Sequence, residues 1–146
     1  MIFASKTARA SVITASLLLT SVPALADEHM RQGAPKGIRA SFFACMDKAR
    51  GDIVGMGACI TPERKFQDTR LNDAYRKLMA RLDGKAQADL KASERGWLEF
   101  NGKTMNVELA VGRDDKTVNI EAGVNELYRY AARADALEGL AGIASD

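Results

Sequence analysis

The chain has 146 residues, 47% of them hydrophobic and 27% charged, which suits one globular domain with a modest core. Lys and Arg number 21 against 19 Asp and Glu, and two of the basic residues lie in an amino-terminal segment that we expect to be removed. The remaining 19 basic and 19 acidic residues balance, so composition gives no support to a nucleic-acid partner, which needs a basic face.

The amino terminus, residues 1–26, has the pattern of a secretory signal peptide. Lys6 and Arg9 precede an apolar run over residues 10–22, which leads to the small-residue site Ala24-Leu25-Ala26. The run is shorter than the roughly 20 residues that span a bilayer, and no cysteine follows the cut to accept a lipid. We therefore expect an exported protein, periplasmic or secreted, without a membrane anchor after cleavage.

Residues 27–36 contain a glycine, a proline and few apolar side chains, so we expect a disordered leader. His29, the only histidine, lies in it and is expected to be a solvated tail residue. A single helical domain is predicted over residues 37–140. Its first helix is predicted from Ile38 to Arg50, where apolar residues recur at helical spacing.

Residues 51–57 contain three glycines and predict a connector or a poorly started helix. Thr61-Pro62-Glu63 then offers an N-cap residue, a proline for the first helical position and an acid for the first turn. This pattern predicts that a long helix begins there and runs to Leu82. Gly84 is expected to be a left-handed cap beyond its end.

Two further long helices are predicted, from about Lys85 to Val111 and from about Lys116 to Leu137, the second capped by Asp114 or Asp115. Residues 141–146 are expected to fray. Strand signals are almost absent. The sequence thus predicts an all-α fold, a small antiparallel bundle of about four helices. The residues that recur at helical spacing in the first of these two helices are Ala86, Leu90, Ser93, Trp97, Phe100, Thr104, Val107 and Val111. The expected inner face of the second is Ile120, Val124, Leu127, Ala131 and Ala134.

The two cysteines, Cys45 and Cys59, predict a disulfide, because an exported protein matures in an oxidising compartment. A loop of about 15 residues closed in this way contributes roughly 3 kcal/mol in the chain-entropy model. The other interpretations are a reactive thiol and half of a metal site. They need a partner base or more ligands, which the sequence does not offer.

The residue inventory does not indicate an enzyme, a metal site or a cofactor site. One histidine and two cysteines supply neither a catalytic triad nor a zinc cluster. Gly55-x-Gly57 lacks the third glycine of a nucleotide-binding loop, and residues 114–121 lack the glycine and the final acid of a calcium loop. Glu94 and Glu99 are five residues apart on a predicted helix and are expected to lie on solvated faces.

One motif stands out, Asp68-x-x-Leu71-Asn72-x-x-Tyr75, followed at a distance by Trp97-x-x-Phe100. Leu71 and Tyr75 share a helix face, and so do Asp68 and Asn72, because both pairs are four residues apart. Two interpretations remain open. The motif is either structural, with a buried asparagine between helices and Tyr75 and Trp97 in the core, or it forms a recognition surface.

In these features the chain resembles the LprI-type lysozyme inhibitor family of small exported bacterial proteins. The resemblance covers about residues 42–137. It rests on the order and spacing of Cys45, Cys59, the Asp68-x-x-Leu71-Asn72-x-x-Tyr75 motif, Leu78, Leu90, Trp97-x-x-Phe100 and Arg133-x-x-x-Leu137.

The chain departs from the family pattern at two places. The family usually has Arg-Asp where this chain has Asn101-Gly102. It also usually carries a second cysteine pair, whose expected positions are occupied here by Met105 and Asn125. We therefore expect the third and fourth helices to be less firmly joined than in the family.

The resemblance implies an interaction protein of the periplasm, without cofactor or metal, that binds lysozyme and blocks it. The alternative is a structural or envelope-stress accessory domain that binds another periplasmic protein or a glycan. A lysozyme assay with the purified protein separates the two.

Overall fold

The computed structural model describes residues 28 and 30–144, and this part of the chain is all-α, as predicted. A short helical segment at residues 30–32 precedes four longer helices, and no strand occurs among the described residues. The expected signal peptide and His29 lie outside them. The longer helices are α2 (Ala40–Ala49), α3 (Ile53–Met79), α4 (Gly84–Gly112) and α5 (Lys116–Ile143).

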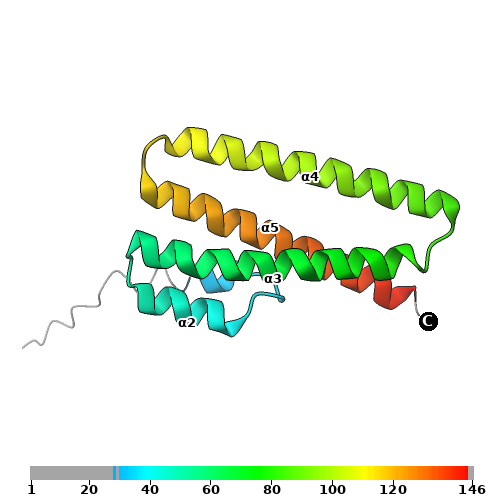
Figure 1. Cartoon of the computed structure of the whole chain (residues 1–146), viewed down its shortest axis with the longest axis horizontal. Coiled ribbons are helices and arrows are strands. Elements are labelled where there is room, and N and C mark those ends of the chain that lie inside the picture. Colours follow the sequence, from blue (N-terminus) through cyan, green and yellow to red (C-terminus); the bar gives the residue numbers. More distant parts are fainter. Residues whose placement is uncertain (1–27, 29, 145–146) are drawn as a thin grey trace, which may run out of the picture.

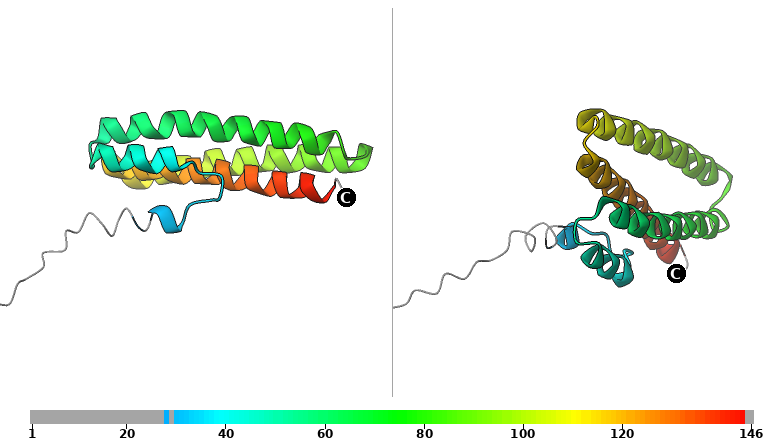
Figure 2. Two further views of the ribbon diagram at one scale, coloured as in Figure 1. Left: turned by 90° about the horizontal axis from the view of Figure 1, so that it is seen from below. Right: turned by 60° about the vertical axis from the view of Figure 1, so that its left-hand side comes forward.

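Helix α5 is the central element of the bundle (Figure 1). Consecutive helices run antiparallel, so α3 and α5 run parallel to each other, and they pack together along most of their length. Helix α2 lies on α3, whereas α4 packs on α5 and stands apart from α3 until the turn that joins them, as Figure 2 shows from other directions.

Two clusters of buried side chains form the core. One joins α3, α4 and α5 around Leu71, Leu90 and Leu137, and the other joins the 38–46 segment, α3 and α5 around Phe42 and Leu127. Four of the five residues predicted for the inner face of the last helix are buried, and the fifth, Ile120, is half-buried. Alanines supply much of this face, which lets α3 approach α5 closely.

The predicted start of the long helix at Thr61-Pro62 is wrong. Helix α3 begins at Ile53, where the Asp52 side chain accepts a hydrogen bond from the Gly55 amide at 2.7 Å. Pro62 lies inside the helix and removes one backbone hydrogen bond. Tertiary contacts override this local cost, because buried Cys59 and Glu63 anchor the helix on both sides of the proline.

The predicted end at Leu82 and the left-handed cap at Gly84 are also wrong. Helix α3 ends at Met79, and Gly84 is the first residue of α4, which Asp83 caps by accepting from the Ala86 amide at 3.1 Å. No left-handed residue is needed at this turn. The Gln87 side chain donates to the carbonyls of Met79 and Leu82, at 3.1 and 3.0 Å, and so satisfies groups left open by the end of α3.

Asp115 is confirmed as the N-cap of α5, since its carboxylate accepts from the amide of Thr117 at 2.8 Å. The expectation of a frayed tail from residue 141 is wrong for residues 141–143, which are helical. Ala141 is buried, and Arg81 donates to its carbonyl. Residues 145–146 lie outside the described part.

The expected disordered leader is at variance with the packing of residues 30–36. Met30 and Ala34 pack against the second core cluster, and Arg31 pairs with Asp47 at 2.7 Å. The Tyr128 hydroxyl donates to the Met30 carbonyl at 2.8 Å, and burial raises the pKa of Tyr128 to about 12, so it remains a donor. Two apolar side chains were too few to signal this docking in the sequence.

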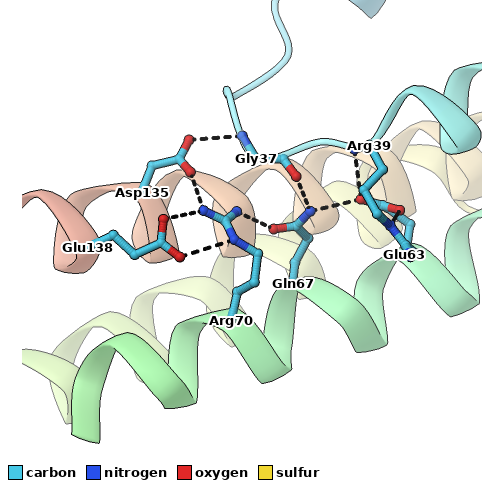
Figure 3. A network of polar contacts seen from close by, with 7 residues as sticks. All are labelled: Gly37, Arg39, Glu63, Gln67, Arg70, Asp135 and Glu138. Atoms are coloured by element: carbon cyan, nitrogen blue, oxygen red, sulfur yellow. Dashed lines mark hydrogen bonds and ion pairs between the residues drawn. The ribbon is translucent and has the colours of Figure 1, made fainter. Parts of the chain in front are cut away.

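A buried polar network fixes the segment before α2 to α3 and α5 (Figure 3). Glu63 and Gln67 are 1% and 0% exposed. The Glu63 carboxylate accepts from the backbone and the guanidinium of Arg39, at 3.1 and 2.7 Å, while the Gln67 amide donates to the Gly37 carbonyl at 2.6 Å and to Glu63 at 2.8 Å. Arg70 continues the network to Asp135 at 2.8 Å.

Glu63→Ala is expected to lower the free energy of unfolding by about 2 kcal/mol, because it leaves the buried side-chain amide of Gln67 and the backbone amide of Arg39 without their shared acceptor. Urea denaturation measures the change. Lys65→Ala, at an exposed position on the same helix, is the control and should stay within about 0.5 kcal/mol of the parent. Equal effects of the two substitutions would show that the network contributes nothing to stability.

Candidate functional site

A groove of about 470 Å³ lies between α3 and α4, with α5 beneath it, and we call it the α3–α4 groove. It contains the four residues of the motif on α3, which the sequence could not place relative to α4. The lining residues are Asp68, Leu71, Asn72 and Tyr75 from α3, Lys91, Glu94, Arg95 and Leu98 from α4, and Tyr130 from α5.

The α3 wall presents both polar and apolar groups of the motif. Leu71 is buried at its base, and Asp68 and Tyr75 are half-buried. Asn72 is exposed, and its side-chain amide donates to the Asp68 carbonyl one turn back at 2.8 Å. The structural interpretation of the motif, a buried asparagine between helices, is therefore wrong for Asn72, whose carbonyl oxygen faces no partner among the described residues.

The floor of the groove is the ring of Tyr130, held from two sides. The Arg64 guanidinium lies 3.0 Å from the ring centroid, and Trp97 meets the ring edge-on at 4.9 Å. Burial raises the pKa of Tyr130 above its ordinary value, against the opposing effect of Arg64, so the hydroxyl stays neutral. These contacts make the floor a fixed aromatic surface.

The α4 wall carries one buried acid and two exposed cations. Glu94, expected on a solvated face, is only 8% exposed and accepts from Arg133 of α5 at 2.6 Å. Lys91 and Arg95 are exposed at the rim. Neither has an ion-pair or hydrogen-bond partner in the part of the chain that the structure describes.

The second motif, Trp97-x-x-Phe100, is divided between two environments. Trp97 is half-buried behind the groove floor and packs against the first core cluster. Phe100 does not line the groove and is 58% exposed, so its predicted place on the inner face is wrong. Val107 and Val111, also expected inside, are 62% and 77% exposed.

Polar residues take the inward positions of α4 instead. Arg129 of α5 donates to Asn101 at 2.6 Å and to both carboxylate oxygens of Glu108, at 2.8 and 3.0 Å. Asn101 is 3% exposed. The sequence prediction placed the apolar flank of α4 inside, because charged residues are rarely buried unless they are paired. The pairing partners on α5 could not be recognised from apolar periodicity.

The positions of the missing cysteine pair lie at one level of the bundle. The antiparallel register that joins Asn101 to Arg129 places Met105 four residues further along α4 and Asn125 four residues back along α5. Asn125 donates to Glu108, one turn beyond Met105, at 3.3 Å. The Arg129 contacts thus join the helices near the positions at which the resemblance led us to expect a second cysteine pair.

Introducing Met105→Cys with Asn125→Cys is therefore expected to form a disulfide and to raise the free energy of unfolding by about 3 kcal/mol for a loop of about 20 residues. Thiol titration and urea denaturation, with and without reductant, measure the bridge and its effect. Met105→Cys with Glu121→Cys, displaced by one turn on α5, is the control and should keep two free thiols. Bridging in the control alone would show that α4 and α5 pack in another register.

Sequence reasoning missed Lys91, Arg95, Leu98 and Tyr130 as groove residues. Only Lys91 and Arg95 could have been noticed in the sequence. They are four residues apart, and like charges at this spacing on one face destabilise a helix. Within the described residues no group of three or more His, Cys, Asp and Glu side chains could hold a metal ion, and none of the helices combines the length and hydropathy of a membrane span.

Comparison with known proteins gives one match. A family model described as "Lysozyme inhibitor LprI" matches residues 45–137, which is more than half of the chain and includes every residue that lines the α3–α4 groove. No curated protein and no solved structure matches the chain significantly.

Proposed function

The chain belongs to the LprI lysozyme inhibitor family, and from this premise we propose that it is an exported protein that binds lysozyme and blocks it through the α3–α4 groove. The observation that carries the proposal is the placement of Asp68, Leu71, Asn72 and Tyr75 along one accessible groove. If the motif served only to pack the core, its polar side chains would be buried and hydrogen-bonded, whereas Asn72 is exposed.

The groove has the composition of a protein-binding surface. The aromatic floor and the exposed Leu98 on the α4 side supply apolar contact area, and the rim supplies amide, carboxylate and cationic groups. The walls are helices rather than loops, so the surface is formed before binding, which reduces the entropy lost in the complex. Blocking in this way needs no chemical step, metal or cofactor.

The test is the clearing of a bacterial cell-wall suspension by lysozyme in the presence of purified residues 27–146. Stoichiometric binding predicts that inhibition rises linearly to a plateau near one inhibitor per enzyme and is unchanged by a chelator. Calorimetry should give the same ratio. Undiminished clearing at a large molar excess of the folded protein would refute the proposal.

A further inference from the structure

The charges in the α3–α4 groove are unbalanced on its α4 side. Asp68 lies 3.8 Å from Arg64, and Glu94 is paired with Arg133, so both groove carboxylates already face a cation. Lys91 and Arg95 have no partner among the described residues. The groove therefore presents two uncompensated positive charges in a chain whose total charge is close to zero.

These two cations are separated by one helical turn. Side chains four residues apart on a helix have their Cβ atoms about 5–6 Å apart, and like charges at this spacing repel each other. The arrangement does not stabilise α4 on its own. An anionic partner with two negative groups at a similar spacing would relieve the repulsion and pair both side chains.

Lysozyme carries two carboxyl groups at its catalytic centre. One is ionised and the other is the general acid, whose raised pKa keeps it protonated, and cations placed beside the pair would favour the ionised form of both. Retaining glycosidases, of which it is one, place two carboxyl groups about 5–5.5 Å apart. We propose that Lys91 and Arg95 pair with the two catalytic carboxylates of lysozyme, so that the rim of α4 occupies the active-site cleft. This inference rests on the proposed function and names the contact through which the groove would act.

The shape of α4 supports entry into a cleft. The helix packs on α5 and stands apart from α3 (Figure 2), and Lys91 and Arg95, which line the groove between them, are exposed to solvent. Ala88 and Ala92 are exposed beside the two cations, so the backbone can approach closely, and Leu98, 51% exposed, adds an apolar contact two turns from Lys91. Arg95 can bind a carboxylate through two parallel hydrogen bonds, and Lys91 can act as a point charge.

The experiment compares lysozyme inhibition by the parent protein, by Lys91→Ala with Arg95→Ala, and by a matched control, Lys48→Ala with Lys116→Ala. All four side chains are exposed and have no hydrogen-bond or ion-pair partner among the described residues, so both variants should keep the parent circular dichroism. Losing two charge-paired contacts should weaken inhibition by the groove variant at least about 100-fold, and the control should stay within about twofold. A soluble chitooligosaccharide that fills the cleft should compete with the parent protein.

The outcomes separate this inference from the proposed function. Full inhibition by the groove variant overturns the inference and leaves the proposed function intact, whereas a parent protein that does not inhibit overturns both. Loss of inhibition without competition by the chitooligosaccharide overturns the inference, because the cations would then contact lysozyme outside its cleft. Binding of the parent, but not of the variant, to cell-wall glycan without lysozyme assigns the cations to a glycan and also overturns it.

Discussion

Replacing both cysteines, Cys45→Ala with Cys59→Ala, is expected to lower the free energy of unfolding by about 3 kcal/mol and the Tm by roughly 10–15 °C. The bridge joins α2 to α3 across a separation of 14 residues, with a Cα–Cα distance of 5.7 Å. Helix α2 has 10 residues, too few for a stable isolated helix in water. Without the bridge it depends on the packing of Phe42 and Met46 and on the polar network at residues 37–39.

Thermal and urea denaturation measure the loss, and the reduced parent protein is the control, because it should unfold like the double variant. Native-state hydrogen exchange adds a local test. The amides of α2 should lose protection first, while those of α5, buried at Leu127 and Ala131, should keep most of theirs. An unchanged Tm in both proteins would mean that the bridge does not contribute to stability.

The fold class could be predicted because two of the helices follow simple rules. Apolar spacing identified α2, Asp115, one of the two predicted caps, caps α5, and four of the five residues predicted for the inner face of α5 are buried. The boundaries of α3 could not be predicted. Pro62 and Gly84 have strong local preferences, but a disulfide, buried Glu63 and the Gln87 side chain outweigh them, and these are contacts between residues far apart or on different helices.

The candidate site could be predicted only in part. The spacing of Asp68, Leu71, Asn72 and Tyr75 places them on neighbouring faces of one helix, and the groove confirms that they lie together. The opposite wall depends on which side of α4 faces inward. That choice is made by Arg129 and Arg133, whose ion pairs pull polar residues of α4 toward α5. Apolar periodicity contains no information about such pairs, so Phe100 was placed inside and Lys91 was overlooked.

Tyr75→Ala is expected to weaken lysozyme inhibition at least about 30-fold, if the α3–α4 groove is the binding surface. Tyrosines at the centre of protein interfaces often contribute about 2 kcal/mol or more, and Tyr75 is half-buried and lines the groove. Asn72→Ala is expected to weaken it about tenfold, through loss of an exposed amide that the fold does not need. Inhibition constants from the clearing assay measure both effects.

Phe100→Ala is the matched control, because Phe100 is a motif aromatic on the same bundle but lies on the other flank of α4, outside the groove. It should change the inhibition constant less than twofold. Tyr75→Phe keeps the ring that packs against the core, so it separates loss of contact from loss of stability, and it should inhibit more strongly than Tyr75→Ala. The reverse pattern, with inhibition lost in Phe100→Ala and kept in Tyr75→Ala, would move the binding surface to the flank of α4 formed by Phe100, Val107 and Val111. The groove would then be a consequence of how α4 packs on α5, and the exposed apolar flank would be the part of the helix that lysozyme covers.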